Sequence, residues 1–177
     1  MDNLQQFKID LKGMKGLEEA FDFNLDGNYF QNIGGEEVKD GSLHTHLDIA
    51  QKSDEFELRF LTKGTVTVAC NLCLEDMTLP IDTCNTIVVK MGENLEDDGD
   101  TITIPAEQGI IDVAWLIYEF VALEIPIRHV HEPGECNAEM TEKIKQLSAR
   151  QAGEGEEAQQ TDPRWKELEK LKTIFKD

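Results

Sequence analysis

The sequence has no long apolar run and no basic leader at its N-terminus. None of its apolar stretches approaches the roughly 18 residues that a helix needs to cross a bilayer. Residues 1–12 have no apolar core after a basic start, so we expect no signal peptide. Both absences predict a cytoplasmic protein. Thiols stay reduced in that compartment, so the four cysteines indicate metal ligands, redox groups or buried side chains rather than disulfides.

Positive charge is scarce. The 177 residues carry 17 lysines and arginines against 36 aspartates and glutamates, which is a formal net charge of −19. Residues 1–140 hold 28 of the acidic side chains and 9 of the basic ones. Because proteins bind nucleic acid largely through cations that neutralise phosphates, we predict weak or no direct RNA contact by residues 1–140. Such a surface attracts a basic partner, for example a ribosomal protein, although acidity also serves simply to keep a protein in solution.

Signatures of catalysis are also missing. There is no phosphate-binding glycine loop, and no local motif pairs a thiol with a histidine as a cysteine hydrolase requires. The CxxC formed by Cys70 and Cys73 is followed by a strand pattern, whereas the thioredoxin-type motif opens a helix whose N-terminus activates the thiol. We therefore expect no enzyme. A thiol- or metal-dependent enzyme of unknown substrate remains the alternative.

What the sequence does contain is alternation of apolar and polar residues with period two, which predicts strands. The alternating segments are residues 7–12, 21–26, 43–49, 56–70, 79–89 and 101–104. The acidic stretch before the last of them, residues 92–100, is predicted to be a solvated loop. Cys84 falls inside a strand and is expected to be a small core residue. Because strands precede helices, we predict an α+β fold with a curved, mostly antiparallel sheet or partial barrel.

One strongly apolar helix is predicted over residues 112–124. Asp112 is a suitable N-cap for it, and Pro126 closes it because proline disfavours helix at the residue before. We expect this helix to cover an open face or end of the sheet. Asn137 is predicted to cap a further helix that runs to about residue 150, so that residues 1–150 form a single domain.

The C-terminal part of the chain has a different composition. Residues 151–161 are rich in Gly, Glu, Ala and Gln and predict a flexible linker. Asp162 and Pro163 then open an amphipathic helix over residues 162–177. That helix is too short to be stable alone in water, so we expect it to dock on its own domain or on a partner. The side chains predicted to make this contact are Trp165, Leu168, Leu171 and Phe175.

The CxxC lies at the turn of a predicted β-hairpin, where Cys70 and Cys73 can both reach one metal ion. A zinc site needs two more ligands, and the loop after the apolar helix offers His129, His131 and Cys136. We predict the ligand set Cys70, Cys73, His131 and Cys136, with His129 as the substitute for His131. Four protein ligands would make one structural zinc site. The alternative is that these thiols and histidines only pack near one another.

Several segments carry a resemblance to a known family. They are Leu58-Arg59-Phe60, Gly64, the run from Val66 to Leu74, Ile111-Asp112, the run from Leu123 to Ile127, and Asp162-Pro163-Arg164-Trp165. With these motifs in this order, the chain resembles the YceD-like family of large ribosomal RNA subunit accumulation proteins. It departs from the family pattern at Leu72, where arginine is common, and it keeps only Cys136 of a second cysteine pair. The resemblance implies a non-enzymatic role in the accumulation of large-subunit (23S) rRNA.

Overall fold

The computed structural model of the protein describes residues 4–93, 96–99 and 101–147. Its elements, in chain order, are η1 (Gln5–Phe7), β1 (Lys8–Asp10), β2 (Glu18–Leu25), α1 (Gly27–Ile33), β3 (Asp40–Lys52), β4 (Glu55–Ala69), β5 (Asp76–Gly92), β6 (Glu96–Asp98), β7 (Thr101–Pro105), β8 (Ile110–Asp112), α2 (Ala114–Glu124) and α3 (Ala138–Leu147). The predicted linker (151–161) and the amphipathic helix (162–177) lie outside the described residues. Within the described part, no helix is long and apolar enough to span a membrane.

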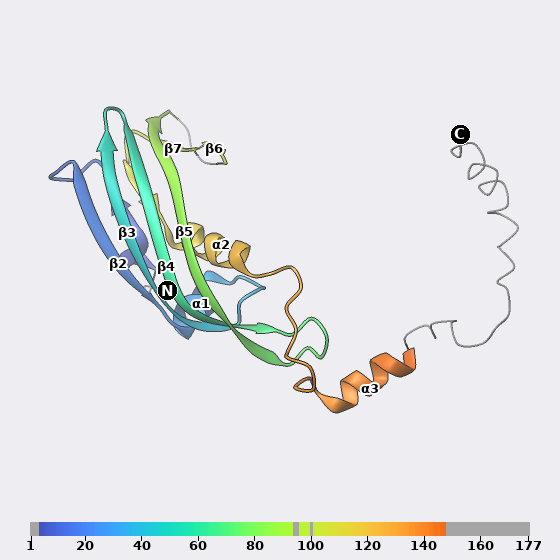
Figure 1. Ribbon diagram of the computed structural model, residues 1–177. Coiled ribbons are helices and arrows are strands. Elements are labelled where there is room, and N and C mark those ends of the chain that lie inside the picture. The colour runs from blue at the N-terminus through green and yellow to red at the C-terminus, as the bar shows by residue number, and fades with distance from the viewer. Residues whose placement is uncertain (1–3, 94–95, 100, 148–177) are drawn as a thin grey trace, which may run out of the picture. The chain divides into compact units, whose positions relative to one another are not determined.

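Six strands form one bent sheet in the order β2-β3-β4-β5-β7-β6, and β1 pairs separately with β8. All pairs are antiparallel except β5 with β7, which run parallel. Figure 1 shows β2 to β5 as long, curved strands with α2 beside them. The predicted α+β class with a curved, mostly antiparallel sheet is therefore confirmed. The sheet does not close into a barrel.

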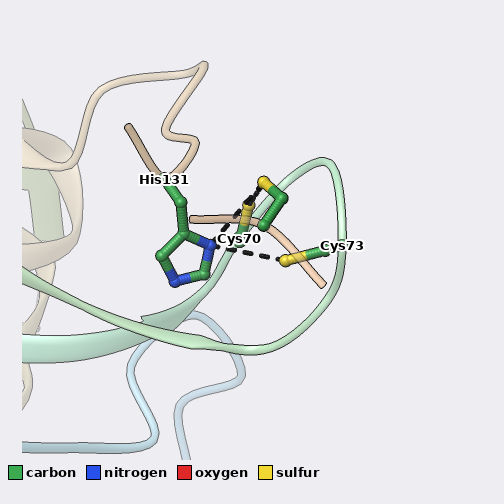
Figure 2. Close-up of side chains that lie close together, drawn as sticks. Cys70, Cys73 and His131 are labelled. Atoms are coloured by element: carbon green, nitrogen blue, oxygen red, sulfur yellow. Dashed lines mark hydrogen bonds between the residues drawn. The ribbon is translucent and has the colours of Figure 1, made fainter. Parts of the chain in front are cut away.

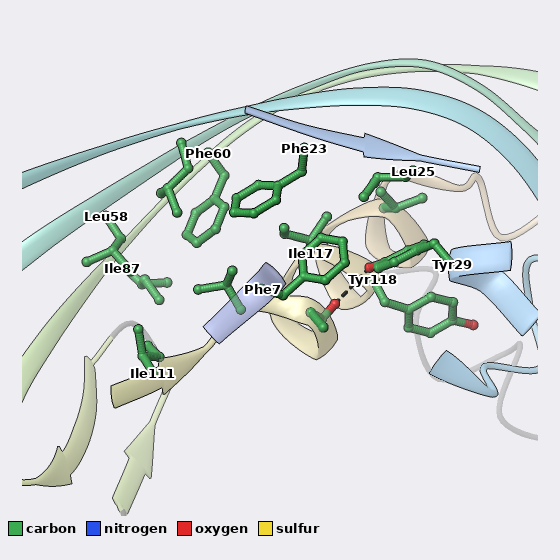
Figure 3. Close-up of a cluster of buried hydrophobic side chains, with 14 of the residues drawn as sticks. Phe7, Phe23, Leu25, Tyr29, Leu58, Phe60, Ile87, Ile111, Ile117 and Tyr118 are labelled. Carbon is green, nitrogen blue, oxygen red and sulfur yellow. Dashed lines mark hydrogen bonds between the residues drawn. The ribbon is translucent and has the colours of Figure 1, made fainter. Parts of the chain in front are cut away.

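The core lies between the sheet and the helices. In β3 and β4 every second side chain is buried over most of the strand, as period-two alternation requires. The register places buried residues opposite one another, for example Leu47 opposite Phe60 and Leu58 opposite Ile87. Figure 3 shows Leu58, Phe60 and Ile87 on the concave side of the strands, in one cluster with Phe7 and Ile117. This packing buries the apolar face of the sheet against the helices.

Helix α2 lies close to the predicted position. Val113 rather than Asp112 occupies the backbone N-cap position, but the Asp112 carboxylate still accepts from the backbone N–H of Ala114 at 3.0 Å. At the other end, Ile125 is extended, as expected for a residue before proline. The face toward the core consists of Ala114, Ile117, Tyr118 and Val121. This i, i+3, i+4, i+7 spacing is that of one helix face.

Two expectations from the sequence were wrong. The acidic stretch 92–100 is not simply a loop, because Glu96–Asp98 pairs with β7 as a short antiparallel strand. Cys84 is exposed on β5 rather than buried in the core. The strand pattern was correct there, but residue 84 lies on the face of β5 that points away from the core. Met1–Lys143 forms one compact unit, and the four predicted metal ligands all belong to it.

Candidate metal centre

The turn between β4 and β5 holds the CxxC. It is closed by backbone hydrogen bonds from Leu74 N–H to the Cys70 carbonyl (3.0 Å) and from Cys70 N–H to the Glu75 carbonyl (2.8 Å). Leu74 adopts a left-handed conformation with φ of 63°, which glycine adopts at lower cost. The Leu72 N–H points at the Cys70 sulfur, 3.4 Å away. The tight turn thus places Cys70 and Cys73, both buried, at the tip of the hairpin.

The loop after α2 is held against this turn by a reciprocal pair of hydrogen bonds. Asn71 N–H donates to the His129 carbonyl at 2.9 Å, and His129 N–H donates to the Asn71 side-chain oxygen at 2.7 Å. The His129 ring is buried, with Nδ1 2.8 Å from the Pro126 carbonyl oxygen and Nε2 3.0 Å from the Ala69 carbonyl oxygen. Both ring nitrogens face backbone acceptors, so His129 joins the loop to the hairpin and neither nitrogen points at the thiols.

The structure brings together the other four predicted residues. The ligand atoms of Cys70, Cys73, His131 and Cys136 all lie within 4.8 Å of one another. His131 Nδ1 is 3.3 Å from the Cys73 sulfur and 3.8 Å from the Cys136 sulfur, and the Cys70 and Cys136 sulfurs are 3.9 Å apart. Figure 2 shows His131 reaching from its loop toward Cys70 and Cys73 on the hairpin. Ligand atoms in a tetrahedral zinc site lie about 3.5–3.8 Å apart, given Zn–S and Zn–N bonds of about 2.3 and 2.0 Å.

Contacts around the cluster orient its ligands. His131 Nε2 lies 3.3 Å from the Asp76 carbonyl oxygen. Donation to that oxygen puts the ring proton on Nε2 and leaves the Nδ1 lone pair facing the sulfurs, which is the arrangement of metal-bound histidines. Beside Cys136, the Asn137 amide donates to Glu75 at 2.6 Å, and its side-chain oxygen accepts from Met140 N–H at 3.1 Å. Asn137 thereby caps α3, as predicted, and fixes the chain next to Cys136.

The thiols of the hairpin and of the loop differ in acidity. Burial raises the pKa of the Cys70 thiol, but the backbone N–H groups of Cys73, Leu72 and His131 outweigh it and lower that pKa to about 6. For Cys73, burial is likewise outweighed by the backbone N–H groups of Asn137 and Glu75, and its pKa is lowered. Burial and the two neighbouring thiols raise the pKa of Cys136 to about 11. The hairpin is therefore arranged to stabilise thiolates, the form that binds metal.

For His131, burial lowers the pKa, but the hydrogen bonds to Cys73, Cys70 and the Asp76 backbone, with the charge of Cys70, together outweigh burial and raise the pKa. Without a metal, the neighbouring thiolates therefore favour the protonated form of the His131 ring. With a metal, three thiolates and a neutral imidazole would supply four ligands. Such a shell leaves no open position for a substrate or a reactive water.

Sequence patterns predicted the four residues that the structure brings together, with His131 preferred to His129 as the histidine ligand. His129 and His131 alternate on an extended loop, and either matches the spacing. The carbonyl oxygens that face the two ring nitrogens of His129 belong to Pro126 and Ala69, and Ala69 is 60 positions away in the sequence. No local signal marks such contacts.

Comparison with known proteins gives one match. Residues 58–172 match the family model described as Large ribosomal RNA subunit accumulation protein YceD. The matched range begins in β4 and includes the whole candidate metal centre. No curated protein and no solved structure matches the chain.

Proposed function

Because the chain belongs to the YceD family of large ribosomal RNA subunit accumulation proteins, we propose that it is a non-enzymatic factor in ribosome biogenesis. Its role is to support the accumulation of large-subunit (23S) rRNA in the cytoplasm. The family match over residues 58–172 is the observation that carries this proposal. The large-subunit precursor, or a ribosomal protein within it, is the proposed partner.

The charge of the domain supports a basic ribosomal component as the immediate partner. Several of its few lysines already contact carboxylates, namely Lys39 with Asp76, Lys52 with Glu57, Lys63 with Asp82, and Lys90 with Glu55. Cations paired in this way are less available to phosphates, and the domain as a whole stays strongly negative. A basic protein surface is attracted to such a domain, whereas an RNA backbone is repelled.

We further propose that Cys70, Cys73, His131 and Cys136 hold one structural zinc ion. The sulfur and nitrogen donor set suits zinc. Three separations between ligand atoms are 3.3–3.9 Å and all of them lie within 4.8 Å, close to the spacing that a zinc ion requires. The ion would join the loop after α2 to the β4–β5 hairpin and so stabilise the fold. A closed ligand shell also favours the non-enzymatic role over a metal- or thiol-dependent enzyme.

Sucrose-gradient fractionation tests the function. We expect the protein to co-sediment with large-subunit precursors at low salt and to be released at high salt, because screening weakens charge attraction. A deletion strain should accumulate less 23S rRNA relative to 16S rRNA, and the full-length gene should restore the ratio. Sedimentation only at the top of the gradient at low salt, together with normal subunit ratios in the deletion strain, would contradict the proposal.

A further inference from the structure

Helix α2 is more apolar than its position in the fold requires. Its eleven residues, Ala114–Glu124, include two charged side chains, Glu119 and Glu124, and a helix that is apolar all round is usually buried. Its buried face contacts the core, and Leu116, Phe120 and Ala122 pack against the core while staying partly exposed. On the other side, Trp115 is 48% exposed and Leu123 is 81% exposed. The fold therefore leaves two large apolar side chains of α2, Trp115 and Leu123, in contact with water.

Two hollows border this exposed face. One, of about 590 Å³, lies between α2 and β5 and is lined by Ile87, Leu116, Phe120 and Leu123, among others. The second, of about 390 Å³, lies where α2 meets β7 and β8 and includes Ile104, Ile110 and Trp115. Ile102 and Leu116 line both hollows, so the two adjoin. We call the two hollows together the α2 groove.

The charge at the α2 groove has one sign. Among the described residues that line it, the charged ones are Glu119 and Asp112, and none is a lysine, arginine or histidine. Trp115 Nε1 donates to Glu119 at 2.6 Å, which fixes that carboxylate beside the exposed indole. An apolar floor with acidic margins selects for apolar side chains flanked by cations.

We propose that the α2 groove binds an apolar segment of a basic protein, one that carries large apolar side chains with lysines or arginines beside them. This inference rests on the proposed function and names the surface through which it acts. RNA is a poor occupant, because the groove offers no cation to phosphates. A second copy of this chain is disfavoured because it would bring like charges together, given a net charge of −19 per chain.

Trp115 provides a direct readout of binding. The chain has two tryptophans, so a Trp165→Phe background leaves Trp115 as the only tryptophan reporter. The probe is a synthetic amphipathic peptide of leucine and lysine, and a leucine–glutamate peptide of the same pattern is its control. We expect the leucine–lysine peptide to shift Trp115 emission to the blue and to bind saturably, and the leucine–glutamate peptide not to bind.

Two matched substitutions locate the surface. Leu123→Lys places a charge in the α2 groove, and Leu17→Lys adds the same charge at another exposed leucine, 70% accessible, that does not line it. We expect Leu123→Lys to weaken peptide binding by about tenfold or more, and Leu17→Lys by less than about twofold. Both side chains are exposed, so both variants should keep the wild-type circular dichroism spectrum and Tm.

The same variants in sucrose gradients separate this inference from the proposed function. We expect Leu123→Lys to abolish co-sedimentation with large-subunit precursors and Leu17→Lys to preserve it. If both variants co-sediment like the wild type, or if both weaken peptide binding equally, the groove assignment is overturned while the family function stands. If the wild type itself never co-sediments and subunit ratios are normal in its absence, the proposed function fails first.

Two further measurements would detect a different occupant of the α2 groove. A wild-type dimer that Leu123→Lys dissociates in sedimentation velocity would assign the groove to a second copy. A red shift of Trp115 emission on introducing Leu168→Glu would assign it to residues 162–177. Either result would overturn the proposal, as would failure of the leucine–lysine peptide to bind the full chain.

Discussion

At the residue scale, hydrogen bonds decide which histidine faces the thiols. His129 and His131 both approach the hairpin, but the two ring nitrogens of His129 face carbonyl oxygens of Pro126 and Ala69. His131 faces a carbonyl with Nε2 only, and its Nδ1 points at the sulfurs. Each imidazole nitrogen has a single proton or a single lone pair to offer. His131 is therefore the histidine with a nitrogen to spare for a metal.

The first prediction concerns zinc. Native mass spectrometry of protein purified without a histidine tag should find one zinc per chain, and Cys73→Ser should abolish it. Free zinc at 100 times the Kd stabilises a folded protein by about 2.7 kcal/mol, so loss of the site should lower Tm by roughly 5–11 °C for a chain of this length. Cys84→Ser is the matched control, because Cys84 is exposed and outside the cluster. A metal-free wild type whose Tm does not change in chelator would rule the site out.

The second prediction concerns pH. A hydrogen bond to Asp22 raises the pKa of His46 above its ordinary value of 6.5, against the opposing effect of burial. The same bond lowers the pKa of Asp22 below 3.8. The His46 contribution to stability is complete below pH 6.5 and is lost as the pH rises through the raised pKa. The Asp22 contribution is present above pH 3.8 and is lost as the pH falls through the lowered pKa. The pair therefore stabilises most between about pH 4 and 6.5.

NMR titration of the His46 ring measures this directly. Asp22→Asn should move its midpoint down toward about 6.5, because the carboxylate that favours the imidazolium is gone. Asp54→Asn, a neutralised acid in the β3–β4 turn, should leave the midpoint in place. If Asp22→Asn leaves the midpoint of the His46 titration unchanged, the two side chains do not interact in solution.

At the element scale, the length and curvature of the strands position the site. Strands β4 and β5 pair from Glu55 opposite Lys90 to Ala69 opposite Asp76, which carries the CxxC turn to the far end of a long hairpin. Gly64 lies within this hairpin, between Leu43 on β3 and Ile81 on β5. Its φ of 146° is available to glycine, and a Cβ there would lie 2.2 Å from the Ser42 carbonyl oxygen. The backbones of β3 and β4 can approach this closely because residue 64 has no side chain.

The third prediction follows from this approach. Gly64→Ala should destabilise the protein by at least about 2 kcal/mol, since it combines an unfavourable φ with a backbone clash. Gly34→Ala is the control: φ there is 73°, but nothing lies within 4 Å of the added Cβ. Gly34→Ala should lower the free energy of unfolding only by the cost of placing alanine in a left-handed conformation, about 1–2 kcal/mol. Urea unfolding measures both, and equal midpoints for the two variants would contradict the close approach of β3.

At the scale of the whole molecule, charge separates the roles of the two ends of the chain. Residues 1–140 are strongly acidic, whereas residues 141–177 carry equal numbers of acids and bases, eight of each. An RNA phosphate near the protein is repelled by the first and not by the second. Seven of the eight basic residues in this part of the chain are the ones that we expect to make any RNA contacts, namely Lys143, Lys145, Arg150, Arg164, Lys166, Lys170 and Lys172.

The fourth prediction is that RNA crosslinks, if they form in cells, map to those seven residues. Crosslinking followed by mass spectrometry of the RNA-linked peptides provides the test. The RNA yield should also fall as salt rises, because each phosphate contact releases a counterion. Crosslinks concentrated on β2 to β5 would show that local geometry outweighs the net charge of the sheet.

The sequence by itself determined the features that depend on neighbours along the chain. Period-two alternation specified the strands, because it assigns each side chain to a face. Asp112 and Pro126 bounded α2 through their local backbone chemistry. The CxxC predicted a tight turn with two thiols, and Asn137 predicted the start of α3. Each of these signals acts within a few residues.

Only the tertiary structure decided the features that depend on distant parts of the chain. The sequence preferred His131 to His129, but the contacts that distinguish the two rings involve residues about 60 positions away. His131 Nδ1 faces Cys73, and His129 Nε2 faces the Ala69 carbonyl oxygen. The parallel pairing of β5 with β7, the exposed position of Cys84 and the uncovered face of α2 likewise depend on how elements pack. Apolar periodicity predicts which face of a helix or strand prefers burial. Whether another element covers that face depends on how the elements pack in the fold.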